Sequence, residues 1–263
     1  GGLVGGGLGT LAIALLIMFM GGDPTAVLQG VGDGQGGGQV TSVPYEPGPQ
    51  EEEWKQQTAV ALADTEDVWT KIFADMGGAY RAPTLVLFSQ EWESGCGFAE
   101  SAMGPFYCPA DQKLYIDLAF YQQMESQLRA GGDFARAYVV AHEVGHHVQN
   151  LLGISNQVHG LQQRDPDSAN QLSVRLELQA DCFAGIYANR IDKYGDVLQS
   201  GDAEEAINAA SAVGDDTLQK SAGRAVVPDS FTHGSSEQRM RWFETGYRSG
   251  SVDACDTFKA ADL

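Results

Sequence analysis

The spacing of apolar residues along the chain predicts several amphipathic helices. In residues 51–77, apolar positions such as Trp54, Val68, Trp69 and Phe73 recur broadly at helical intervals until two glycines follow. This segment predicts one or two helices. Similar spacing predicts helices over 133–153, 168–191, 201–216 and 235–250. The helix over 133–153 should begin at Asp133 as its N-cap and stop at Gly153.

Two shorter apolar stretches have the pattern of strands. Residues 83–90 form an apolar run after a proline, and residues 113–124 begin with alternating Leu114, Ile116 and Leu118 before a helical pattern. Residues 154–169 are rich in polar side chains and predict a connection without regular structure. The fold class expected is therefore α+β, mostly helical, with a small sheet.

The N-terminal region differs in composition from the rest. Residues 3–20 carry no charge and approach the length needed to span a bilayer, so residues 1–22 predict one transmembrane anchor, with a cleaved signal peptide as the alternative. Residues 23–50 are dense in glycine and proline and predict a flexible linker. Residues 51–263 are then expected to form one globular domain.

Charge and cysteine content narrow the function. The formal net charge of -19 excludes nucleic acid as a partner, because affinity for phosphates depends on lysine and arginine. The four cysteines, at positions 96, 108, 182 and 255, form an even set that suits disulfides in an oxidising compartment. Cys96 and Cys108 could close a short loop, and Cys182 with Cys255 would complete the set. Free buried thiols are one alternative, and a cysteine zinc site is disfavoured because the chain has no C-x-x-C spacing.

The sequence AHEVGHHVQN, residues 141–150, carries the strongest chemical signal. On a helix, His142 and His146 lie about 40° apart on one face and can share a ligand, whereas His147 lies about 140° from His142. With Glu143 between them they form H-E-x-x-H, a zinc-binding pattern in which the glutamate acts as general base toward the metal's water. The alternative is a chance pattern on a buried helix whose histidines only make core hydrogen bonds.

A third zinc ligand is needed, and Glu177 is the best candidate. It lies among apolar residues in the middle of the next predicted helix, where a charge needs a partner, and Asp181 follows one turn later. Asp181 could accept a hydrogen bond from the free ring nitrogen of a ligating histidine. Alternatively, both carboxylates could form a solvated acidic edge.

These motifs resemble those of a known bacterial family, the putative neutral zinc metallopeptidases. The resemblance rests on H-E-V-G-H from 142 with E-L-Q-A-D from 177, together with F-Y-C-P at 106–109, L-Y-I-D-L-A-F at 114–120 and T-H-G-S-S-E-Q-R at 232–239. It covers about residues 50–258. It implies a membrane-held, mostly helical zincin-like domain, with Zn²⁺ on His142, His146 and Glu177 and with Glu143 as general base. The stretch between His146 and Glu177 is longer than in the best-known Glu-zincins, which places an insertion at 151–169 beside the cleft.

His233 is a further catalytic candidate. Its segment resembles the Thr-His segment that supplies an oxyanion donor in related membrane metallopeptidases. A loop histidine before a helix starting at Ser235 is the alternative, and Arg239 could hold that helix by pairing with an acid. His147 and His159 are interpreted as structural or exposed.

The function expected is zinc-dependent hydrolysis of peptide bonds in a peptide or protein substrate. The alternative is a membrane-tethered binding or scaffold protein whose zinc is structural. The anchor and the cysteines together predict a single-pass protein of the bacterial cell membrane whose catalytic domain lies on the extracytoplasmic, periplasmic side.

Overall fold

The computed structural model describes residues 48–88, 91–100, 104–195 and 198–263. The predicted anchor over 1–22 lies outside these residues, as does the predicted linker over 23–50 except for its last three positions. Within the described ranges, no helix is both long and apolar enough to cross a membrane.

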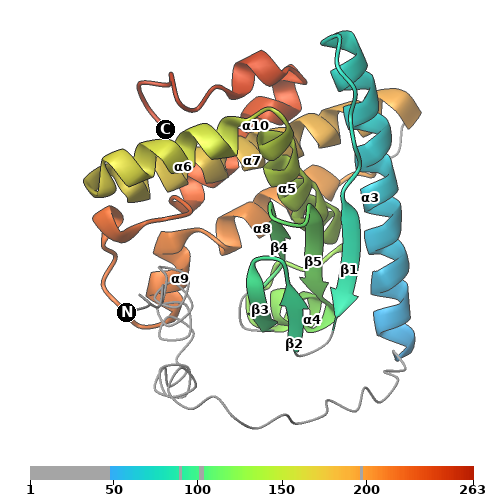
Figure 1. Cartoon of the computed structure of the whole chain (residues 1–263). Coiled ribbons are helices and arrows are strands. Elements are labelled where there is room, and N and C mark those ends of the chain that lie inside the picture. The colour runs from blue at the N-terminus through green and yellow to red at the C-terminus, as the bar shows by residue number, and fades with distance from the viewer. Residues whose placement is uncertain (1–47, 89–90, 101–103, 196–197) are drawn as a thin grey trace, which may run out of the picture.

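Helices dominate, accompanied by a small sheet and a separate hairpin, as Figure 1 shows, so the predicted α+β class is confirmed. The α-helices are α3 (Pro49–Asp75), α4 (Leu118–Ser126), α5 (Asp133–Leu151), α6 (Ile154–Arg164), α7 (Ala169–Gly195), α8 (Asp202–Ala212), α9 (Asp215–Ser221) and α10 (Ser236–Ser249). The strands are β1 (Thr84–Phe88), β2 (Glu91–Ser94), β3 (Gly97–Glu100), β4 (Phe106–Cys108) and β5 (Lys113–Asp117). Three short 3-10 helices lie in the described part of the chain: η2 (Pro166–Ser168), η3 (Pro228–Ser230) and η4 (Val252–Cys255).

The three-stranded sheet has the order β1-β5-β4, with β1 parallel and β4 antiparallel to the central β5. Leu114 and Ile116 of β5 are fully buried in the main core, and Tyr115 between them is buried in a smaller cluster with Phe88 and Cys108, so both faces of this strand are covered. The long helix α3 runs beside β1, and α6 projects away from the sheet (Figure 1). The sheet therefore covers one side of the helical core.

Three local predictions were wrong. Residues 154–164 form helix α6 instead of a polar connection, because Ile154, Val158 and Leu161 share one helical face and Val158 is buried. The predicted helix over 201–216 is divided into α8 and α9. The N-cap of α5 is Gly132 rather than Asp133, which is the first helical residue.

The core is built around α5 and α7, which pack closely. A Cβ on Gly145 would lie only 3.0 Å from the Ala180 carbonyl oxygen, so the glycine inside H-E-V-G-H permits this approach. Helix α10 approaches the other side of α7 even more closely, where a Cβ on Gly246 would lie 1.9 Å from the Cys182 carbonyl oxygen. These two glycines place polar side chains of α5 and α10 against α7.

Candidate metal centre

The three predicted ligands come together where α5 faces α7. His142 Nε2 lies 3.1 Å from Glu177 Oε2, and His146 Nε2 lies 3.5 Å from Glu177 Oε1. One ligand atom from each residue lies within 4.8 Å of the other two. Donors held tetrahedrally about 2.0–2.1 Å from zinc would be roughly 3.3 Å apart, so the spacing and the two-nitrogen, one-oxygen donor set suit this ion.

Electrostatics at these ligands favour a cation. Burial lowers the pKa of His142, but the charge and hydrogen bond of Asp181, with help from Glu177, raise it to about 10. For Glu177, burial raises the pKa, whereas the two histidines bring it well below its ordinary value. The Glu177 carboxylate is therefore ionised, and carboxylates that favour a proton on the imidazoles also favour a metal ion there.

Asp181 supports His142 as the sequence led us to expect. Its Oδ1 lies 2.8 Å from His142 Nδ1 and accepts a hydrogen bond of 2.6 Å from the Tyr138 hydroxyl. Arg239 of α10 donates to both carboxylate oxygens, at 2.8 Å and 2.9 Å. Burial raises the pKa of Asp181, but Arg239 and His142 lower it to about 2. Arg239 thus pairs with an acid, and that acid is the one behind His142.

His146 has a support that the sequence reasoning missed. Gln149 is fully buried, and its Oε1 lies 2.9 Å from His146 Nδ1. The available signal was the spacing of His142, His146 and Gln149 at i, i+4 and i+7, which is a single helical stripe.

Glu143 lies on the same helix and is only 8% exposed. Burial lowers the pKa of His146, while the charges of Glu177 and, less strongly, Glu143 raise it above the ordinary value. Glu143 is therefore close enough to the ligands to act on them electrostatically.

His233 lies before α10 in a loop that Asp215 holds. Oδ2 of Asp215 accepts backbone N–H groups from Thr232, His233 and Gly234 at 2.8, 2.7 and 3.1 Å. Oδ1 of Asp215 lies 3.2 Å from His233 Nδ1. Burial lowers the pKa of His233, but the hydrogen bond to Asp215 and the charge of Glu177 raise it overall. A Cβ on the next residue, Gly234, would lie 3.2 Å from Leu178 Cδ2, so this loop packs against α7, the helix that carries Glu177.

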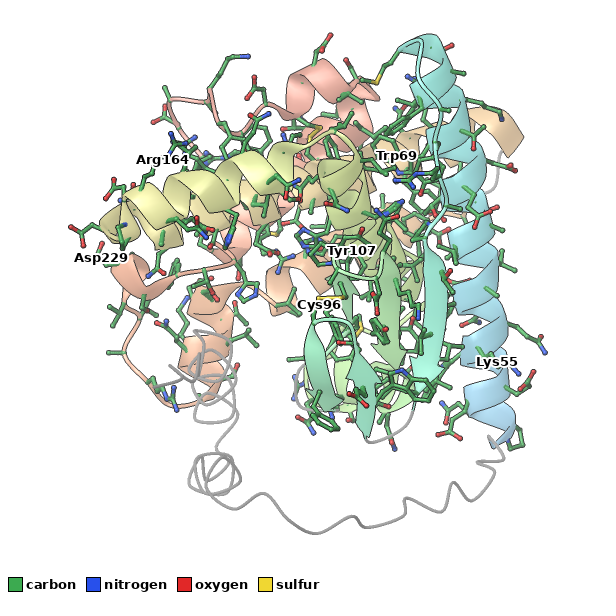
Figure 2. All side chains as sticks on the ribbon, viewed as in Figure 1. Lys55, Trp69, Cys96, Tyr107, Arg164 and Asp229 are labelled. Atoms are coloured by element: carbon green, nitrogen blue, oxygen red, sulfur yellow. A yellow bond between two sulfur atoms is a disulfide. The ribbon has the colours of Figure 1, made fainter. Side chains whose placement is uncertain are left out.

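His147 is structural and points away from the cluster. Its ring is fully buried, with Nε2 2.6 Å from the Arg81 carbonyl oxygen and Nδ1 3.0 Å from the Tyr107 hydroxyl. Figure 2 labels Tyr107 near the middle of the molecule, and it joins β4 to α5 through this contact. His159 is exposed on α6.

All four cysteines are paired. Disulfides join Cys96 to Cys108 and Cys182 to Cys255, so free thiols and a cysteine metal site are ruled out for this structure. The first ties the turn of the β2–β3 hairpin to β4, where Figure 2 labels Cys96, and the second ties α7 to η4.

Comparison with known proteins agrees with the resemblance seen in the motifs. The chain is 49% identical over 256 residues to "Uncharacterized protein YpfJ" of Escherichia coli (strain K12), covering 96% of this chain and 86% of that protein. It is 43% identical over 219 residues to "Uncharacterized protein Rv2575" of Mycobacterium tuberculosis (strain ATCC 25618 / H37Rv), covering 79% of this chain and 72% of that protein. No solved structure matches the chain. The model of one protein family, described as "Putative neutral zinc metallopeptidase", matches residues 1–258, and the chain belongs to this family.

Proposed function

We propose that the chain is a zinc-dependent peptidase that hydrolyses peptide bonds in peptide or protein substrates. The convergence of His142 Nε2, His146 Nε2 and a carboxylate oxygen of Glu177 carries this proposal. A His₂Glu set is a ligand set of catalytic zinc. The residues that the structure describes add no fourth side chain to this cluster, which suits a site with a coordination position left for water or substrate rather than a structural zinc.

Each remaining group has a role in such a reaction. Zinc held by the three ligands would supply a Lewis acid that polarises the scissile carbonyl and activates water. Glu143 takes a proton from the attacking water and passes it to the leaving amine. His233, whose Nδ1 is engaged by Asp215, offers its other nitrogen as a donor to the carbonyl oxygen as negative charge develops there.

The covalent structure also supports a proposal about the compartment. Disulfides persist in oxidising environments and are rare in a reducing cytoplasm. Both cysteine pairs are formed in this structure, which supports an extracytoplasmic location for the domain.

Substituting the general base tests the enzymatic proposal. Glu143→Gln should retain zinc, because Glu143 is not a ligand, and should abolish cleavage of an unfolded protein substrate, since the amide cannot take up the proton. Zinc content by atomic absorption and release of peptides are the two measurements. The matched control is Glu244→Gln, which removes an exposed carboxylate from α10 and should leave zinc content and peptide release unchanged.

Full proteolysis by Glu143→Gln would overturn the mechanism. A wild-type protein with zinc bound by a fourth protein ligand and no hydrolysis would favour the scaffold alternative.

A further inference from the structure

The two histidine ligands are held from behind by different kinds of group. His142 meets a carboxylate, Asp181, whereas His146 meets the neutral amide of Gln149. A carboxylate can only accept a hydrogen bond from the ring. A side-chain amide has an oxygen that accepts and a nitrogen that donates, so its effect on His146 depends on which way the amide is turned.

Backbone carbonyl groups determine that orientation. Nε2 of Gln149 lies 2.7 Å from the Leu176 carbonyl oxygen and 3.2 Å from Gln179 Oε1. A carbonyl oxygen can only accept, so the nitrogen of Gln149 must face Leu176 and its oxygen must face His146. Turning the amide over would bring two oxygens together at Leu176.

The amide of Gln179 is oriented in the same way. Its Nε2 donates to the Cys255 carbonyl oxygen at 3.0 Å, which leaves its Oε1 as acceptor for Gln149. Gln149 and Gln179 are both buried, so water does not compete freely for these groups. Hydrogen bonds therefore run in one direction from His146 to Cys255.

The C-terminal end of this chain of hydrogen bonds is itself firmly held. Cys255 is joined to Cys182 by a disulfide, and Arg175 donates to the carbonyl oxygens of Thr257 and Ala260. The Thr257 hydroxyl returns a hydrogen bond of 2.6 Å to the Arg175 carbonyl oxygen. Residues 255–260 are thus fixed to α7, the helix that carries Glu177.

We propose that Gln149 is a positioning residue for the metal centre: it keeps the proton of His146 on Nδ1, so that the lone pair of Nε2 points to the metal, and Gln179 and the C-terminal segment keep Gln149 turned correctly. The inference rests on the proposed zinc site. It extends the site from the three ligands to a segment about eighty residues further along the chain.

Near-isosteric substitutions test this role. Gln149→Met keeps the volume and removes the acceptor, so zinc affinity, measured by competition with a chromophoric chelator on the intact, disulfide-bonded chain, should fall about 10- to 100-fold. Gln179→Met leaves the contact with His146 but frees the Gln149 amide to turn, so it should weaken zinc binding by a smaller factor. Gln219→Met is the matched control, since Gln219 is also buried and bonded at both ends of its amide, to Ser230 and Val227. It should leave zinc affinity unchanged.

Nuclear magnetic resonance can measure proton exchange at the His146 ring, which would not change if Gln149 only stabilised the fold. In zinc-loaded wild-type protein, ¹⁵N–¹H spectra of the imidazoles should show a slowly exchanging Nδ1–H on both His142 and His146. Gln149→Met should abolish slow exchange at His146 and spare His142.

The outcomes separate this inference from the function on which it rests. If wild-type protein binds no zinc, the proposed function itself fails. If wild-type protein binds zinc while Gln149→Met binds it equally well, only the role of Gln149 is refuted. Rapid exchange of the His146 Nδ1–H in the wild-type protein would refute it without any variant, so misfolding of a variant cannot leave the matter open.

Discussion

At the scale of single residues, Asp181 is held by several partners behind the proposed ligands. It is fully buried; His142 and Tyr138 contact its Oδ1, and Arg239 contacts both of its oxygens. A buried carboxylate without such partners would be strongly unfavourable. Arg239 provides the compensating charge, with its own side chain only 4% exposed.

Removing Arg239 should therefore destabilise the fold. Arg239→Met leaves Asp181 buried without its counter-charge, and the free energy of unfolding should drop by about 3–5 kcal/mol. Urea denaturation followed by circular dichroism measures this. The control is Arg248→Met, which breaks an exposed pair with Glu244 and should cost about 0–1 kcal/mol. Equal, small losses for the two variants would contradict the argument.

Residue-level chemistry was predictable where it involved charge. Glu177 and Asp181 could be singled out because carboxylates are unexpected between apolar residues of a helix. Gln149 could not, because a neutral amide is unremarkable in sequence and its partners, Leu176 and Gln179, lie about thirty residues away on another helix. Its importance depends on how α5 packs against α7.

At the scale of elements, the loop before α10 depends on the start of α9. Asp215, the first residue of α9, accepts three successive backbone N–H groups and contacts the His233 ring. Burial raises the pKa of Asp215, but its bonds to His233 and Thr232 lower it overall. The loop and the helix are thus joined by one carboxylate.

Asp215→Asn should lower the pKa of His233, because the variant removes a negative charge that raises it. Zinc bound to Glu177 would reduce the effect of the Glu177 charge on the pKa of His233. Asp215 would then be the main cause of the raised pKa. If protonated His233 donates to the carbonyl oxygen, activity falls as pH rises through its pKa, and the alkaline limb of kcat/KM should move to lower pH in the variant. Titration of the His233 ring by nuclear magnetic resonance checks the shift directly. An unchanged alkaline limb of kcat/KM would show that His233 takes no part in the reaction.

His233 and Asp215 also contribute to the free energy of unfolding, each over its own pH range. The contribution of His233 is complete below its ordinary pKa of 6.5 and is lost as pH rises through the raised value in the folded chain. The contribution of Asp215 is complete above 3.8 and is lost as pH falls through its lowered value. The free energy of unfolding of wild-type protein should exceed that of Asp215→Asn most clearly between pH 3.8 and pH 6.5.

Elements with long apolar stripes were predicted well, whereas short ones were missed. The helices over α3, α5, α7 and α10 have several buried positions each, which makes their period visible. Helix α6 has one buried residue, Val158, among many polar ones, so its period was obscured. Strand β4 is three residues long, too short for alternation to be recognised.

At the scale of the whole molecule, the two disulfides constrain the chain very differently. Cys96 and Cys108 are 12 residues apart, whereas Cys182 and Cys255 are 73 apart. Loop-closure entropy grows with the length of the loop, so the longer bridge restricts the unfolded chain more strongly.

Because both cysteine pairs are bridged, protein denatured without reductant should expose no free thiols in a thiol titration. Four free thiols would show that the disulfides do not form.

Replacing both Cys182 and Cys255 with serine should lower the free energy of unfolding by about 4 kcal/mol, against about 3 kcal/mol for the pair Cys96 and Cys108. Guanidinium denaturation of the two double variants compares them. A larger loss from the shorter bridge would show that loop entropy does not govern the difference.

The pairing of Asp181 with Arg239 also sets the charge balance at the metal centre. These two opposite charges cancel behind His142, and Gln149 adds none behind His146, so the negative charge beside the two histidines comes from Glu177, with Glu143 acting on His146 less strongly. A divalent cation would make the buried centre electrically neutral. The neutrality of Gln149 limits the negative charge there. A carboxylate in its place would also accept from His146, but it would add a buried charge beside the Leu176 carbonyl oxygen and the Gln179 amide.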